Sequence, residues 1–184
     1  MKKYLITSQD FYSDEPELFR NILYKQIVKN KPDFILYRDK ENLKYSEQAI
    51  DFIDECRKFK SLKTFIHRDI LLAKKLKATG VHLTSKQFEE IPLALSLNLD
   101  VIISTHSYKE VFLAQEMGAT YVTYSPIFLT PNKGIPKGIE DLKYLLTQTE
   151  IKIFALGGIV NEEHLSAIAQ TETFGFASIR YFIK

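Results

Sequence analysis

The sequence predicts a compact α/β fold, a (β/α)8 TIM barrel with eight parallel strands, forming one domain over residues 1–184. Eight short runs rich in β-branched and aromatic residues alternate with segments of helical apolar spacing. Many of these runs are apolar without strict alternation, which is typical of strands covered on both faces. The chain length allows 23 residues for each of eight units, which is enough for a strand, a short helix and two short loops.

The expected strands cover residues 4–7, 34–37, 64–67, 81–83, 101–104, 121–124, 152–156 and 173–176. Apolar residues three or four positions apart predict a helix after each strand, as at Leu18, Ile22 and Ile27, at Ala49, Ile50, Ile53 and Phe59, and at Leu72, Ala73 and Leu76. An open doubly wound sheet is the alternative. Such a sheet usually has five or six strands, so two of the eight runs would have to be loops.

Composition excludes several classes of protein. Hydrophobic residues make up 45% and charged residues 26%, as in ordinary globular chains. A net charge of +2 provides no basic field for nucleic acid. Cys56 is the only cysteine, and no apolar run reaches the roughly 18–20 residues of a membrane span. We therefore expect a cytoplasmic protein with neither nucleic acid nor membrane as a partner.

In a parallel barrel, functional groups gather where the strands end and the following loops begin. Gly157 and Gly158 end the seventh strand, and Ala177 and Ser178 follow the eighth. Their backbone N–H groups could hold a phosphate, and glycine would let the backbone approach it closely. The alternative is that the two glycines only form a tight turn before Asn161, which would cap the next helix.

Cations at other strand ends predict a second anion site. Arg38 and Lys40 are two residues apart, so on an extended strand end they point to the same side and could clamp a pyrophosphate or carboxylate. The alternative is a solvated pair offset by Asp39 and Glu41. Lys133, in the long loop after the sixth strand, is either a lid cation or a mobile surface lysine.

Four histidines offer acid/base chemistry. His106 follows the fifth strand and has the best position to meet a substrate, and His67 ends the third strand. We expect His82 to be a hydrogen-bonded core residue and His164 to be exposed on a helix. No cluster of side chains has metal-ligand spacing, so we predict no metal site.

With these residues in view, the chain resembles the thiamine phosphate synthase and TenI superfamily, whose barrels handle the thiazole phosphate half of thiamine. The resemblance covers nearly the whole chain and is carried by residues 37–40, 80–83, 104–107, 118–122, 125–133 and 155–159. It implies that Gly157, Gly158 and the segment from Ala177 form a cradle for thiazole phosphate. It also implies that Arg38 and Lys40 hold a pyrimidine pyrophosphate, and that Ser104, Thr130 and Lys133 meet substrate or pyrophosphate.

The departures from the family pattern concern its metal and its catalytic groups. The resemblance implies Mg²⁺ in the synthases, held by an Asn-Asp pair after the third strand and a further Asp after the fourth. In this chain the first two positions are His67 and Arg68, and the third falls near Gln87. Leu36 replaces a glutamine that contacts the pyrimidine. The TenI branch lacks the metal set and is the closer relative by this criterion. Its tautomerases carry a catalytic histidine where this chain has Pro126, so His106 or His67 would have to serve instead.

We therefore expect a TenI-like, metal-independent thiazole tautomerase that binds a small phosphorylated thiazole and moves a proton with His106 or His67. Two alternatives remain. One is a non-catalytic thiazole phosphate binder or regulator. The other is a thiamine phosphate synthase with an altered metal site, which would need Mg²⁺ as its only cofactor. Barrels of this family commonly form small homo-oligomers, and exposed apolar faces would allow one here.

Overall fold

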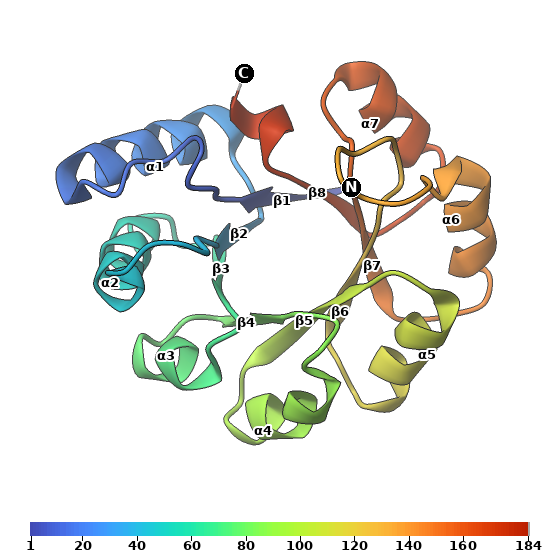
Figure 1. Ribbon diagram of the computed structural model, residues 1–184, viewed down its shortest axis with the longest axis horizontal. Helices are drawn as coiled ribbons and strands as arrows, with labels where there is room; N and C mark the ends of the chain where they lie inside the picture. Colours follow the sequence, from blue (N-terminus) through green and yellow to red (C-terminus); the bar gives the residue numbers. More distant parts are fainter. Residues whose placement is uncertain (184) are drawn as a thin grey trace.

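The eight strands close into one parallel barrel in the computed structural model, which describes residues 1–183 (Figure 1). Each strand pairs with the next in sequence, and β8 pairs with β1 to complete the ring. This confirms the barrel and excludes an open doubly wound sheet. The strands are β1 Lys2–Ile6, β2 Phe34–Tyr37, β3 Lys63–His67, β4 Gly80–Leu83, β5 Asp100–Thr105, β6 Tyr121–Tyr124, β7 Lys152–Leu156 and β8 Gly175–Ser178.

Helices surround the barrel (Figure 1). The α-helices are α1 Pro16–Asn30, α2 Tyr45–Cys56, α3 Ile70–Lys75, α4 Ile91–Ser96, α5 Tyr108–Glu116, α6 Gly138–Leu146 and α7 Glu162–Ala169, and the 3₁₀ turns are η1 Phe88–Glu90 and η2 Arg180–Ile183. The prediction of a helix after every strand is wrong for β8. There the short turn η2 covers the barrel by stacking Phe182 on Phe176, with ring centroids 5.5 Å apart. No helix of the described residues is both long and apolar enough to cross a bilayer.

The inward faces of the helices differ in part from the predicted ones. Leu18 and Ile50 were expected to pack inward, but each side chain is about half exposed. The buried face of α1 is formed instead by Phe19, Leu23 and Ile27. A spacing of three or four residues occurs on more than one face of this helix, and only contact with the barrel selects which face is buried.

The last strand begins two residues later than predicted. Thr173 belongs to the preceding turn, where its hydroxyl donates to the Ile153 carbonyl at 2.8 Å. Pairing with β7 starts at Gly175, which lies opposite Phe154. This shift places Ala177 and Ser178 inside the end of the strand, whereas the sequence prediction put them in the loop that follows.

Aromatic side chains fill the inside of the barrel. Tyr4, Phe34, Phe65, Tyr121 and Phe154 are all at most 4% exposed and pack with ring centroids 5.0–6.0 Å apart. Burying each such ring stabilises the fold by roughly 1.5–3 kcal/mol. The barrel is therefore a packed core rather than a pore, which leaves the loops after the strands to form a site.

Two glycines make room for these rings. A Cβ added to Gly175 would lie 2.7 Å from the Phe154 ring, and one added to Gly80 would lie 2.6 Å from the Phe65 ring. Both positions also face a backbone carbonyl at 2.6 Å or less. Small residues beside large ones let the inner layers interdigitate.

Candidate functional site

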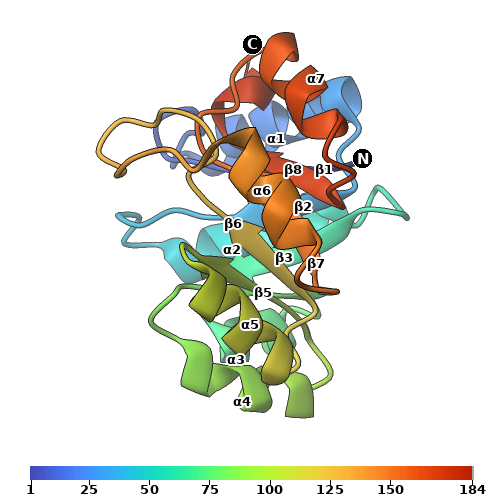
Figure 2. The ribbon, with the colours of Figure 1, turned by 90° about the vertical axis from the view of Figure 1, so that its right-hand side faces the viewer.

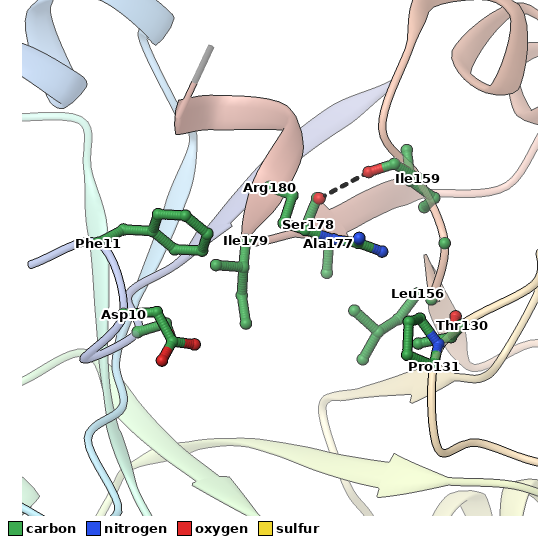
Figure 3. A pocket seen from close by; sticks show the side chains of 13 residues that line it. Asp10, Phe11, Thr130, Pro131, Leu156, Ile159, Ala177, Ser178, Ile179 and Arg180 are labelled. Atoms are coloured by element: carbon green, nitrogen blue, oxygen red, sulfur yellow. Dashed lines mark hydrogen bonds between the residues drawn. The ribbon is translucent and has the colours of Figure 1, made fainter.

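A cavity of about 320 Å³ lies where β7 and β8 end (Figure 3). The loop after β1 forms one side of it with Asp10 and Phe11, and the loop after β6 forms the other with Thr130 and Pro131. Residues 156–159 and 177–180 lie between them. Four loops from one end of the barrel thus enclose a space large enough for a small phosphorylated ligand.

Gly157 and Gly158 lie in this cavity, and both have left-handed backbone conformations, with φ of +99° and +69°. A Cβ on Gly157 would lie 2.8 Å from Pro126 Cα, and one on Gly158 would lie 2.6 Å from the Leu129 carbonyl oxygen. The glycines are therefore required by the close packing of the β6 loop as well as by φ. The two glycines also form the tight turn that was the alternative prediction. Asn161 follows this turn and caps α7 by accepting a hydrogen bond from the His164 amide at 2.9 Å.

The predicted phosphate-binding residues of β8 line the cavity, and both are buried. Ala177 is fully buried and Ser178 is 5% exposed. The Ser178 hydroxyl donates to the Ile159 carbonyl at 2.8 Å, the bond drawn in Figure 3, and accepts from the Tyr181 amide at 3.2 Å. These bonds hold the end of β8 against the loop after β7.

Arg180 is a cation of this cavity, and the sequence placed it at the end of the segment from Ala177 without giving it a role. It is exposed, and its side chain extends past Ser178 and Ala177 into the pocket in Figure 3. Arg180 also lines a neighbouring hollow of about 720 Å³ together with Thr130 and Lys133. Apart from the resemblance, its signal in the sequence is a cation four residues beyond the predicted end of the eighth strand, which is common on protein surfaces.

The loop after β6 brings Thr130 and Lys133 to the second hollow. The Thr130 hydroxyl donates to the Phe128 carbonyl at 2.9 Å. His164 lines the same hollow and stacks on Phe128 with ring centroids 4.1 Å apart. It is partly buried, so the expectation that His164 is exposed is wrong.

The charges of Arg38, Arg68 and Lys133, which come from three loops, act on Lys40 at this end of the barrel. Arg38 and Lys40 follow β2, Arg68 follows β3, and Lys133 comes from the β6 loop. The charge of Arg38, followed by burial and the charges of Lys133 and Arg68, lowers the pKa of Lys40. Figure 2 shows the β2 and β6 loops leaving the barrel on the same side. We name Arg38, Lys40, Arg68 and Lys133 the cation cluster.

The two histidines predicted as acid/base groups have different surroundings. Burial, and then the charges of Arg38, Arg68 and Lys40, lowers the pKa of His67 to about 3. His67 is thus neutral at physiological pH and holds no imidazolium proton to deliver. His106 is exposed, and its Nδ1 lies 3.2 Å from both the carbonyl and the hydroxyl oxygen of Ser125. Neither histidine is among the residues that line the two cavities.

Ser104, another predicted substrate contact, lies at the barrel end of β5 and is half-buried. Its hydroxyl lies 3.0 Å from Nε2 of His82. His82 is 3% exposed, and its Nδ1 lies 2.8 Å from the Tyr4 hydroxyl. The prediction that His82 is a hydrogen-bonded core residue is confirmed.

The family model described as thiamine monophosphate synthase matches residues 3–182. The chain belongs to this family. Among its relatives, the thiamine-phosphate synthase of Clostridium acetobutylicum is 29% identical, over 97% of this chain and 85% of that protein. The putative thiamine-phosphate synthase 2 of Aquifex aeolicus is 33% identical, over 70% of this chain and 69% of that protein.

Solved structures show the same fold. The thiamine phosphate pyrophosphorylase from Pyrococcus furiosus superposes with a TM-score of 0.76 at 23% identity, covering 97% of this chain and 85% of the other. The N-acetylmannosamine-6-phosphate 2-epimerase of Clostridium perfringens gives a TM-score of 0.74 at 11% identity, covering 98% and 87%. At such identities the likeness concerns architecture alone.

The magnesium site implied by the synthase resemblance does not fit the residues of this family member. Asp39 accepts from the amides of Glu41 and Asn42, and Asp69 caps α3. Where the pattern asks for carboxylates, Arg68 brings a positive charge, and the Gln87 amide is bonded to Thr84, to Glu90 and to the Arg68 carbonyl. Among residues 1–183 no three His, Cys, Asp or Glu side chains lie together as a metal site would need.

Proposed function

We propose that this member of the thiamine monophosphate synthase family is a transferase that joins a pyrimidine pyrophosphate to a thiazole phosphate. One observation carries the proposal: the same end of the barrel has both the cavity at β7 and β8 and the cation cluster. A tautomerase needs a single phosphate anchor, whereas a synthase must hold two phosphorylated ligands. The names of the relatives support the synthase over the tautomerase favoured by the sequence.

The phosphate of the thiazole would occupy the cavity of Figure 3. Backbone around Gly158 and Ile179 lines it, and the Arg180 guanidinium supplies charge. A guanidinium matches a phosphate by donating two parallel hydrogen bonds. The buried Ser178 and Ala177 form the floor of the cavity, which the Ser178 hydroxyl holds in place through its bond to the Ile159 carbonyl.

The pyrophosphate of the pyrimidine would bind the cation cluster. The bond between pyrimidine and pyrophosphate breaks, the pyrophosphate leaves with the electron pair, and a bond to the thiazole ring forms. Positive charge aimed at the leaving group stabilises the negative charge that develops on it. Arg68 and Lys133 add to Arg38 and Lys40 the charge that this departure needs, and Arg68 supplies it at a position where the metal-binding pattern has a carboxylate.

The test is product formation from the two phosphorylated halves, with excess EDTA and with added Mg²⁺. We expect product in both conditions, and we expect Arg38→Gln to lower kcat/KM by about a hundredfold or more. Arg57→Gln is the matched control, because Arg57 lies at the end of α2, paired with Asp54. Absence of product under both conditions would overturn the proposal.

The tautomerase remains a second candidate because the described chain lacks the family's acidic metal donors. It would use His106, whose Nδ1 lies 3.2 Å from the carbonyl oxygen of Ser125. Incubation with the unaromatised thiazole carboxylate phosphate decides this: acceleration that His106→Gln removes would support it. Calorimetric binding of thiazole phosphate, with neither reaction catalysed, would instead indicate the non-catalytic binder.

A further inference from the structure

Three polar side chains form a chain of hydrogen bonds inside the barrel, below the cation cluster. Tyr4 comes from β1, His82 from β4 and Ser104 from β5. The Tyr4 hydroxyl lies 2.8 Å from His82 Nδ1, and His82 Nε2 lies 3.0 Å from Ser104 Oγ. The Tyr4 and His82 rings also stack, with centroids 5.8 Å apart and planes at 25°. We name these three residues the hydroxyl relay.

Burial fixes the direction of the first hydrogen bond. Tyr4 is fully buried, and within residues 1–183 its hydroxyl has no hydrogen-bond partner other than His82 Nδ1. If Nδ1 carried the imidazole proton, the Tyr4 proton would be left without an acceptor in an apolar core, which is costly. Tyr4 therefore donates, and Nδ1 accepts.

The direction of the second bond follows from the charge of His82. Burial, and then the nearby His67 and Arg38, lowers the pKa of His82 well below its usual value, so the ring is neutral. A neutral imidazole has one N–H, which must be on Nε2 when Nδ1 accepts. Nε2–H therefore donates to Ser104 Oγ, and Ser104 keeps its own proton for another partner.

We propose that Tyr4 and His82 are positioning residues that hold Ser104 as a hydrogen-bond donor toward the mouth of the barrel. The ligand atom that meets Ser104 is then an acceptor with a free lone pair, such as an aromatic ring nitrogen or a phosphate oxygen. A ligand that presents only an N–H at this point is disfavoured, because it can use the second lone pair of Ser104 Oγ but leaves the Ser104 proton without an acceptor. The identity of the ligand rests on the proposed function, but the direction of the relay does not.

The direction can be measured in the free protein. Nitrogen-15 NMR of the histidine rings distinguishes the Nε2–H tautomer from the Nδ1–H tautomer, and we expect His82 to be in the Nε2–H form throughout pH 6–8. Tyr4→Phe keeps the ring contacts but removes the hydroxyl, so a mixture of tautomers should appear. Tyr12→Phe is the matched control, because the Tyr12 hydroxyl is also buried but has no partner among the described residues. A His82 ring in the Nδ1–H form in the natural protein would overturn the proposal.

Binding then tests whether the relay acts through Ser104. We expect Tyr4→Phe to weaken the binding of one of the two ligands by about tenfold, the loss expected for one hydrogen bond. Thiazole phosphate and pyrimidine pyrophosphate are titrated separately by calorimetry. In a Ser104→Ala background, Tyr4→Phe should change the affinity no further. Equal affinities of the natural protein and Ser104→Ala for both ligands would also overturn the proposal.

The two proposals fail in different ways. If neither ligand binds the natural protein, the proposed function is wrong, and the NMR spectrum of His82 alone supports or overturns the relay. If both ligands bind and the transfer reaction runs, but His82 is in the Nδ1–H form, the proposed function stands and the relay falls.

Discussion

His67 shows how strongly the pKa of a single side chain depends on its neighbours. It ends β3, and burial together with the charges of Arg38, Arg68 and Lys40 lowers its pKa to about 3. A histidine at a barrel strand end is a natural candidate for acid/base chemistry, and the sequence predicted that role. Burial and the surrounding cations both oppose the charged form of the ring, so the role stays a prediction, for a neutral imidazole. At neutral pH, His67 is therefore an uncharged side chain beside the cation cluster.

This low pKa makes stability depend on pH. The unfolded chain protonates His67 near pH 6.5, whereas the folded chain does so near pH 3. Between these values the unfolded state binds more protons, so the free energy of unfolding falls as pH falls, by up to about 1 kcal/mol per pH unit. Above pH 6.5 the contribution of His67 is complete. Urea unfolding at pH 7 and pH 5 should show a smaller loss for His67→Gln than for the natural protein, and equal losses would contradict the assignment.

Gly158 gives a second prediction at this scale. We expect Gly158→Ala to destabilise the fold by roughly 1–3 kcal/mol, because Ala disfavours a φ of +69° and its Cβ would meet the Leu129 carbonyl oxygen at 2.6 Å. The displaced β6 loop should also weaken the binding of thiazole phosphate. Gly134→Ala is the control, since nothing lies within 4 Å of a Cβ at Gly134. Thermal unfolding and calorimetry measure the two effects, and a variant as stable as the control would refute the packing argument.

At the scale of elements, the packing inside the barrel pairs a glycine on one strand with an aromatic ring on the neighbouring strand. Gly80 on β4 faces the Phe65 ring, and Gly175 on β8 faces the Phe154 ring. The rings fill the space that a side chain at the glycine would take. Strand β4 therefore contributes little bulk at its first position, and β3 fills the gap from the neighbouring strand.

Gly80→Ala should accordingly cost more than a typical surface change. Its Cβ would approach the Asp100 carbonyl and the Phe65 ring, and neither backbone nor packed ring can move freely. We expect a loss of roughly 2 kcal/mol or more in the free energy of unfolding, measured by urea titration. Gly80→Ala combined with Phe65→Leu should recover part of the loss, and no recovery would show that the backbone contact dominates.

Much of the element order could be predicted because apolar runs and turn residues are local. All eight strands overlap their predicted ranges, and only β8 begins two residues late, where Thr173 bonds within a turn. The buried face of α1 could not be chosen, since more than one face carries apolar residues. The site was harder still: Arg68 and Arg180 lie near predicted residues such as Lys40 and Thr130 only because loops from different strands converge, and no local spacing encodes that proximity.

For the whole molecule, we expect one end of the barrel to contribute to stability and the other to bind ligands. At the end opposite the cavities, Lys63 Nζ bonds Asp100 at 2.9 Å and the Tyr121 hydroxyl at 3.2 Å. Both charged side chains are partly exposed, so the pair adds at most about 1 kcal/mol. The cation cluster at the other end consists of like charges that oppose one another. Stability and ligand binding should therefore respond to different residues.

Two variants test this separation. Asp100→Asn should lower the free energy of unfolding by up to about 1 kcal/mol and leave the affinity for inorganic pyrophosphate unchanged. Arg38→Gln should weaken pyrophosphate binding while leaving stability equal or slightly raised, because one of several like charges is removed. Urea titration and calorimetry in EDTA give both quantities for each variant. A parallel loss of stability and affinity in both variants would argue against two independent ends.

The predicted homo-oligomer stays a prediction. Helix α1 exposes Leu18, Tyr24 and Val28, each about half accessible. Isolated apolar side chains of this kind are common on monomers as well. Sedimentation of the natural protein at several concentrations measures the state directly.

The aromatic filling of the barrel also determines from which side ligands can reach the proposed site. The interior is closed by the rings of Tyr4, Phe34, Phe65, Tyr121 and Phe154. Ligands can therefore approach the proposed site only from the side where the β2 and β6 loops emerge (Figure 2). Two ligands bound at this end of the barrel would therefore enter and leave on the same side, past the loops that follow β2 and β6.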